Sequence, residues 1–356
     1  MHFEDGEISE KYSKYIRKKI LFIFLVFIAL MFVMIVSISV GSVHIEFFEV
    51  IKTLLKNSSS RQFELIIWNI RLPQTLTAIV AGAGLASAGT VMQSVLRNPL
   101  ASPFTLGIAH AAAFGAAFSV MILGTGVMAS SFNDALRISN PVVTLLSAFF
   151  FSMATACLIT YISKIRGASP ETMVLTGVAL GSLFMAGTML LQFFADDVQL
   201  AAMVFWTFGD VARADWKDFY FLFGVTLCLL IYFLANTRNY NAMDMGDETA
   251  KGLGVKVESI RLSAMMAASL ATSVIISFVG IISFIGLVAP HIVRRVIGDD
   301  QKFLMPASIL VGALILLSAD IVARLVLLPH VLPVSIFTSF LGAPVFIYLI
   351  IKGHKK

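Results

Sequence analysis

Charged residues are scarce in this 356-residue chain, where they make up 13% of the sequence, and cysteine occurs only twice. A soluble domain carries nearer to a quarter charged residues, so this composition excludes an ordinary soluble protein. Cys157 and Cys228 both fall within apolar stretches. They are therefore expected to be small buried side chains, and neither a disulfide framework nor a cysteine metal site is expected. The sequence also lacks G-x-x-x-x-G-K-[ST], the loop that binds nucleotide phosphates, so no ATP hydrolysis by this chain is expected.

Hydrophobic residues dominate instead, at 58% of the chain, and the mean hydropathy is +0.90. Apolar segments long enough to cross a bilayer recur along the whole sequence, which predicts an all-α integral membrane protein with ten spans. The eighth is expected to be short, kinked or re-entrant, because it contains Gly280, Gly286 and Pro290. The predicted spans are 20–40, 74–96, 104–124, 139–162, 172–194, 218–235, 260–279, 281–297, 303–323 and 334–351.

The distribution of positive charge predicts the orientation of these spans. With an even number of spans both termini lie on one side, and a cytoplasmic amino terminus puts most of the 26 basic residues inside. The predicted organisation is a cytoplasmic tail over 1–19, a membrane domain over 20–352 and a cytoplasmic tail over 353–356. The net charge of +5 then reflects orientation in membrane lipid, and no nucleic-acid partner is expected.

The segment from Arg71 to Pro103 predicts a tightly packed membrane helix. Gly82, Gly84 and Gly89 lie within its apolar stretch, between Pro73 and Pro99. In lipid, small residues let a neighbouring backbone approach closely, and such contacts drive helix association there. These three glycines are therefore expected to pack helices.

Two external segments follow from the predicted topology. Phe47, Phe48 and Ile51 belong to an apolar pattern with helical spacing, which predicts an amphipathic helix at the outer interface. The segment 196–217 contains several aspartates and two tryptophans, and a solvated loop is expected there.

The largest internal polar segment, 236–258, predicts a short helix-turn-helix surface. Asp247, Glu248 and Thr249 supply polar groups suited to a helix start, and Gly252 and Gly254 permit a sharp turn. Helix ends require capping groups for structural reasons alone, so a loop that merely caps the adjacent spans remains an alternative. A compact internal surface of this kind is suited to contact with a cytoplasmic partner.

Several blocks of sequence together resemble the membrane permease subunits of ABC importers for iron-siderophore complexes, haem and cobalamin. They are RLPQ, GAGLASAG, MQSVLRNPLASPFTLGIAHAAAFGAA, GDETAKGLGV, GIISFIGLVAPHIVRRVIGDD and SADIVARLVLLPHVLPVSIFTSFLGAPVFIYLI. The resemblance extends from about residue 70 to residue 351. It implies the ten-span bundle of a type II ABC importer permease, in the cell membrane of a bacterium or archaeon.

The resemblance also implies the partners of the chain. They are a cytoplasmic ABC ATPase dimer that uses the ATP, an external substrate-binding protein, and a second copy of this chain or a related permease. The chain itself would bind no cofactor and no metal. The leading cargo is a ferric siderophore or similar metal chelate, and cobalamin and haem are the alternatives within the family.

Three groups of site residues follow from the resemblance. Arg71 and Arg324 are expected to dock carboxylates of the binding protein, although Gln74 stands where many relatives carry a second arginine. Ser169, Pro170 and Glu171 are expected to form a cytoplasmic gate, with simple helix capping as the rival interpretation. Residues expected to contact the ATPase are Asp247, Glu248, Thr249, Ala250, Leu253, Gly254 and Val255.

Other polar residues receive structural interpretations. His291, Arg294 and Asp299 do not form a convincing metal-ligand set. Asp320 can pair with Arg324 at a spacing of i, i+4, so it needs no proton-relay role. A secondary transporter or channel is the alternative of a different class, but few charges lie at mid-span and no clear inverted repeat is visible. A membrane receptor without transport is a third possibility.

Overall fold

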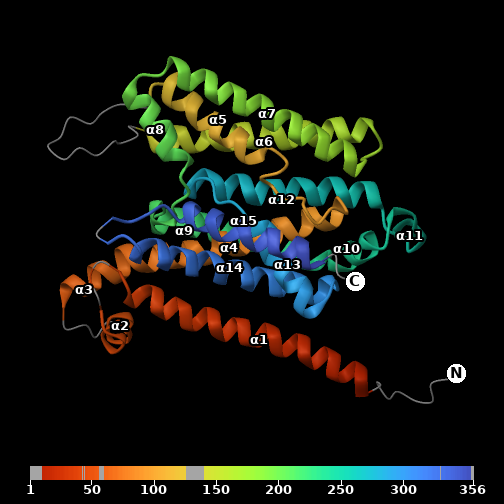
Figure 1. The fold of residues 1–356 in the computed structure, drawn as a ribbon, viewed down its shortest axis with the longest axis horizontal. Coiled ribbons are helices and arrows are strands. Elements are labelled where there is room, and N and C mark those ends of the chain that lie inside the picture. Colours follow the sequence, from red (N-terminus) through yellow and green to blue (C-terminus); the bar gives the residue numbers. More distant parts are fainter. Residues whose placement is uncertain are drawn as a thin grey trace.

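The chain folds into a bundle of long helices (Figure 1). The computed structural model describes residues 10–41, 43, 45–55, 60–125, 140–328 and 330–353, and no strand occurs among these residues. A π-helical segment, η1 (Ile67–Arg71), joins α3 to α4, and a 3₁₀ turn, η2 (Val211–Arg213), lies between α8 and α9. In chain order the α-helices are α1 (Glu10–Ser39), α2 (Phe47–Leu54), α3 (Arg61–Ile66), α4 (Leu72–Val95), α5 (Ile108–Met121), α6 (Pro141–Ile165), α7 (Pro170–Phe194), α8 (Asp197–Thr207), α9 (Trp216–Ala235), α10 (Thr237–Asp244), α11 (Asp247–Gly252), α12 (Val257–Val279), α13 (Ile285–Ile297), α14 (Gln301–Leu325) and α15 (Val334–Gly353).

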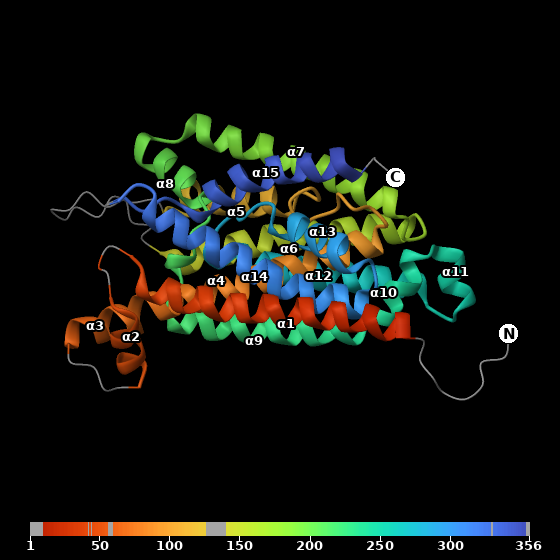
Figure 2. The same ribbon diagram turned by 60° about the horizontal axis from the view of Figure 1, so that its bottom comes forward.

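Helix α4 forms the centre of the bundle. It packs against α14, α12, α13 and α9, and nearly all its side chains are buried. Helices α5, α6 and α7 form a second group, which contacts the central group mainly through α12. The start of α1 and the end of α15 lie at the end of the bundle that carries α10 and α11, whereas α2, α3 and α8 lie at the opposite end (Figures 1 and 2).

The glycines of α4 are points of close backbone approach. A methyl group at Gly82 would lie 2.5 Å from the carbonyl oxygen of Gly312 on α14, and one at Gly89 would overlap the carbonyl group of Gly286 on α13. A methyl group at Gly84 would meet side chains instead, with Ile275 Cδ1 at 2.5 Å. All three glycines therefore lie at helix contacts. Two of these contacts are between backbones, which side-chain rotation cannot relieve.

The predicted count of ten spans is not confirmed. Among the described residues, seven helices are long and apolar enough to cross a membrane. Helix α5 and the segment Val334–Val345 of α15 are shorter apolar helices, and α13 has 13 residues. The eighth span is thus short, as predicted. It follows a non-helical segment in which Gly280 has φ +77° and Phe284 φ +67°.

The boundaries of two spans differ from the predicted ones. The second span was expected to start at Gln74, but α3, η1 and α4 form one continuous run from Arg61 to Val95. Pro73 lies in the first turn of α4, where a helix has no need of the missing N–H. The third span was expected to start at Phe104, but α5 begins at Ile108 after a left-handed Gly107.

The predicted division into tails and a membrane domain concerns segments that are partly helical. Helix α1 begins at Glu10, so the predicted tail is helical from that residue, and residues 1–9 and 354–356 lie outside the described residues. The division into tails and a membrane domain otherwise stays a prediction.

The two external segments have different outcomes. Helix α2 forms where the amphipathic helix was predicted. The expected solvated loop is wrong, because most of its first half is helix α8, which starts with a capping box at Asp196 and Gln199. Trp206 is 5% exposed and packs into the bundle.

Cys157 and Cys228 are exposed free thiols, so the prediction that they are buried is wrong. They lie on α6 and α9, two helices whose surfaces carry many exposed large hydrophobic side chains. Hydrophobicity alone does not distinguish a helix face toward lipid from one toward protein, because both favour apolar residues.

Candidate functional site

Helices α10 and α11 form a surface at one end of the bundle (Figure 1). Helix α11 starts after Gly246, which has φ +111°, and the chain turns back into α12 through Gly254, which has φ +83°. The seven residues predicted to contact an ATPase divide between two faces. The outward face consists of the exposed Glu248, Thr249, Leu253 and Gly254, and the inward face of Asp247, Ala250 and Val255.

The outward face combines an apolar residue with polar groups. Leu253 is 65% exposed, and Glu248 pairs with Lys251 at 2.9 Å. The Glu248 carboxylate, as hydrogen-bond acceptor and negative charge, raises the pKa of Lys251. An exposed leucine at a tight turn is suited to an apolar groove on a partner, with the charged groups at the rim. The predicted ATPase contact itself stays a prediction.

Polar bonds fix α10 to the bundle. Asp244 accepts hydrogen bonds from Ser94 Oγ of α4 at 2.7 Å and from Gln301 Nε2 of α14 at 2.8 Å. Asn241 donates to Asp300 Oδ1 at 3.0 Å and accepts from the backbone N–H of Gln301 at 2.7 Å. The α10–α11 unit therefore rests on α4 and α14 and does not extend freely from the bundle.

The predicted gate residues form the start of α7. Ser169 is the N-cap, and its hydroxyl accepts from the backbone N–H of Thr172 at 3.2 Å and donates to Glu171 Oε2 at 2.8 Å. Pro170 occupies the first turn, where its fixed φ suits a helix start. The structure thus shows a capped helix start, and the gate role stays a prediction.

Arg71 lies at the opposite end of the bundle, where it caps α1. The residue is 4% exposed, and its guanidinium donates to the carbonyl oxygens of Ile38 at 2.7 Å and Ser39 at 2.9 Å, and also to that of Val43. The last carbonyls of a helix have no partner within the helix, and a cation there is favourable. Arg71 therefore satisfies the end of α1 and presents no free guanidinium to the surface.

Arg324 is buried beside it, in a network with Asp320 and Gln74. Arg324 pairs with Asp320 at 2.9 Å, which confirms the predicted i, i+4 pair, and donates to Ser37 Oγ at 2.7 Å. Gln74 donates to Asp320 Oδ1 at 2.8 Å. Gln74 thus has a local structural role as a donor to a buried carboxylate. The docking role of Arg71 and Arg324 stays a prediction, and their burial disfavours it.

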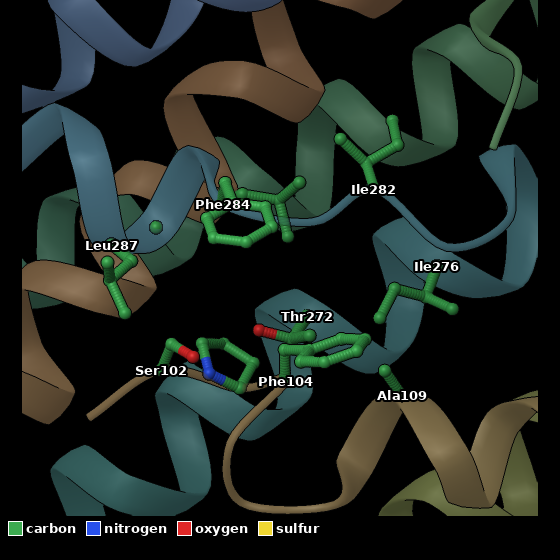
Figure 3. A pocket seen from close by; sticks show the side chains of 11 residues that line it. Ser102, Phe104, Ala109, Thr272, Ile276, Ile282, Phe284 and Leu287 are labelled. Carbon is green, nitrogen blue, oxygen red and sulfur yellow. The ribbon is translucent and has the colours of Figure 1, made fainter. Parts of the chain in front are cut away.

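A small cavity lies in the bundle interior, between the non-helical segment that follows α4 and the one that follows α12 (Figure 3). Its volume is about 20 Å³, enough for roughly one water molecule. Ser102 and Phe104, which follow α4, face Ile282 and Phe284, which follow α12. Phe284 also contacts Gly342 of α15, where a methyl group would lie 2.5 Å from Phe284 Cβ. The helix breaks that shape the third and eighth spans therefore meet at one place.

No functional role is predicted for Arg261 from sequence, because one basic residue near a span end is typical of a headgroup anchor. The structure buries its side chain, at 2% exposure, and pairs it with Asp247 at 2.6 Å. Arg294 bonds to Gln93 Oε1 at 3.0 Å and to Asp299 at 2.8 Å. In the part of the chain that the structure describes, no group of three His, Cys, Asp or Glu side chains has the arrangement of a metal site.

Known proteins are similar to this chain over almost its whole length. The sequence profile of the FecCD transport family matches residues 29–352. A protein of Methanocaldococcus jannaschii named as a candidate ABC transporter permease is 49% identical over 98% of this chain and 99% of its own length. The hemin transport system permease protein of Yersinia pestis is 34% identical over 90% of this chain and 93% of its own length.

The fold is also similar to a solved structure. That structure is an inward-facing conformation of a candidate metal-chelate type ABC transporter, and it matches with a TM-score of 0.80 and 27% sequence identity. The match covers 93% of this chain and 98% of the other.

Proposed function

The chain belongs to the FecCD transport family, and from this membership we propose that it forms the translocation path for an iron chelate in an ATP-driven importer. It is a multi-pass membrane permease subunit of an ABC importer. The family match over residues 29–352 carries this conclusion, because it extends from Ala29 in α1 to Lys352 in α15 and includes the α10–α11 surface. Hydrolysis of ATP is assigned to separate ATPase subunits, because the sequence contains no phosphate-binding loop.

The proposed cargo is a ferric siderophore or a similar metal chelate. The name of a metal-chelate transporter among the similar proteins supports this chemical class, whereas that of a hemin permease supports haem. Haem and cobalamin are the competing cargoes. The proposed partners are an ATPase dimer, an external binding protein, and a second copy of this chain or a related permease. The ATPase would contact the outward face of α11, where Leu253 is exposed.

Reconstitution tests this function directly. The chain, its ATPase and its binding protein are placed in vesicles, and uptake of a radiolabelled ferric siderophore, haem and cobalamin is compared with and without ATP. We expect uptake of the ferric chelate with ATP and none with a non-hydrolysable analogue. Uptake driven by an ion gradient through the isolated chain would refute the proposal and would favour a secondary transporter.

Cytoplasmic termini are the proposed orientation, because they put most of the 26 basic residues inside. The end of the bundle with α11 would then be internal and α2 external. After Cys157 and Cys228 are replaced by serine, an impermeant maleimide is expected to label Lys52→Cys in intact cells, and Lys251→Cys only after permeabilisation. Both lysines have exposed side chains, so accessibility is matched. The reverse labelling pattern would invert the topology.

A further inference from the structure

The Arg261 guanidinium joins three segments that are distant in sequence. Its Nε donates to the carbonyl oxygen of Val95, the last residue of α4, at 2.8 Å. Its Nη1 donates to the carbonyl oxygen of Ala168, in the turn between α6 and α7, at 3.0 Å. Its Nη2 donates to Asp247 Oδ1, on the first residue of α11, at 2.6 Å. One buried cation thus connects the α11 surface with the start of α7 and the end of α4.

Two of these segments contain strained backbone. Arg97, two residues after Val95, has φ +49°, and Ala168 has φ +56°. This left-handed region favours glycine, and a non-glycine residue is strained there and persists only where the surrounding structure holds it. The two carbonyl oxygens that accept from Arg261 therefore lie at or next to strained backbone, which hydrogen bonds from other segments help to hold. The turn around Ala168 depends on a residue that is also bonded to α11.

The third bond is directed at the first residue of α11. Asp247 lies on the inward face, while the ion pair of Glu248 and Lys251 is on the outward side, where both side chains are more than half exposed. A force applied to the outward face would thus reach the bundle partly through Asp247 and Arg261. Ala168 directly precedes Ser169, the N-cap of α7, so the path ends at the helix start predicted to form the gate.

We propose that Arg261 is a positioning residue that transmits displacement of α11 to the turn that begins α7. The inference rests on the proposed function, because it assumes that an ATPase moves α11. A guanidinium suits this role, since its planar fork holds three acceptors in fixed directions at once. A lysine ammonium at the end of a flexible stem does not reproduce that geometry. Removal of Arg261 should therefore separate ATP hydrolysis from transport.

The test compares Arg261→Met with wild type in the complete vesicle-reconstituted complex with ATPase and binding protein. Uptake of the ferric chelate, ATP hydrolysis and co-purification of the ATPase are measured on the same preparations. We expect ATPase binding to persist and the rate of ATP hydrolysis to stay above about half of the wild-type rate. Uptake of chelate per ATP hydrolysed should fall about tenfold below wild type. Arg261→Lys should show a similar loss, because it keeps the charge but not the fork. Arg166→Met is the matched control, because Arg166 is an exposed arginine of the same turn, and it should match wild type.

A double-mutant cycle tests the path through α11. Asp247→Ala alone should also lower uptake per ATP, and Arg261→Met with Asp247→Ala should be no worse than Arg261→Met alone, since both changes break one link. Additive losses would overturn the proposal. It would also be overturned if uptake and hydrolysis fell in equal proportion, because Arg261 would then be a structural anchor only.

If Arg261→Met does not fold, distances measured in protein that retains Arg261 and its hydrogen bonds keep the proposal testable. Spin labels are placed at Lys251→Cys on α11, Arg166→Cys in the turn and Lys52→Cys on α2, at the opposite end of the bundle, in pairs, after replacement of the native cysteines. On nucleotide binding, the distance from α11 to the turn should stay constant while both distances to α2 change. A changing α11-to-turn distance would overturn the link. Failure of the proposed function is separate, because wild type itself would then show no ATP-driven uptake.

Discussion

Replacement of Gly89 by alanine is expected to lower the yield of folded protein sharply and to abolish ATP-driven uptake. The added methyl group would overlap the carbonyl group of Gly286, which belongs to the backbone of α13 and cannot rotate away. Helices α4 and α13 would therefore have to separate. Overpacking of a tight core costs about 1–3 kcal/mol even when side chains can adjust, and here the cost should exceed that range. Thermal unfolding in detergent, followed by size-exclusion fluorescence, measures the effect.

A graded series of glycine substitutions provides the control. Gly224→Ala on α9 meets no atom within 4 Å and should be neutral or slightly stabilising, because alanine favours helix by about 1 kcal/mol. Gly84→Ala should be milder than Gly82→Ala, since Gly84 faces side chains and Gly82 faces the backbone of Gly312. If Gly89→Ala unfolded at the same temperature as Gly224→Ala, the close contact of α4 with α13 would be contradicted.

This central contact shows how far the sequence could predict the fold. The small residues of α4 predict close packing, and the structure places Gly82 and Gly89 against backbone. Their partners, Gly286 and Gly312, lie some 200 residues later, and no local pattern indicates which glycines meet. Composition predicts an all-helical membrane bundle, but it does not fix where a helix breaks. The break before α13 depends on left-handed Phe284, which packs against Gly342 of a distant helix.

In the candidate site too, some features could be predicted from local sequence and others depend on distant contacts. The glycines within the sequence GDETAKGLGV predict the short helix-turn surface, because a glycine ends a helix through its own backbone conformation and needs no distant partner. The buried arginines could not be assigned from local sequence. Arg71 finds its acceptors at the end of α1, and Arg261 finds its acceptors on α4, α11 and the α6–α7 turn. A basic residue near a span end is normally interpreted as a surface group, and only tertiary contacts show that it is buried.

Arg324→Ala is expected to destabilise the protein by about 3–5 kcal/mol, because it leaves the Asp320 carboxylate buried without its cation. Asp320 is 2% exposed, and Gln74 would remain as one hydrogen-bond donor. The same substitution also removes the bond from Arg324 to Ser37 Oγ, which holds α1 against α14. Lys52→Ala is the control, because Lys52 also forms a short ion pair, with Glu49 at 2.8 Å, but on the exposed helix α2. Its loss should leave the unfolding temperature nearly unchanged, because water screens an exposed ion pair.

The double variant Arg324→Met with Asp320→Leu distinguishes a buried charge from a docking site. Replacement of a buried ion pair by apolar residues is often close to neutral, so most of the lost stability should return. The bonds of Arg324 to Ser37 are still missing, so recovery should stop short of wild type. A docking role predicts the opposite pattern, with unchanged unfolding temperature in Arg324→Ala and weakened binding of the external protein in both variants. Thermal unfolding and binding-protein titration on the same preparations therefore separate the two roles, because a structural clamp affects the first measurement and a docking residue the second.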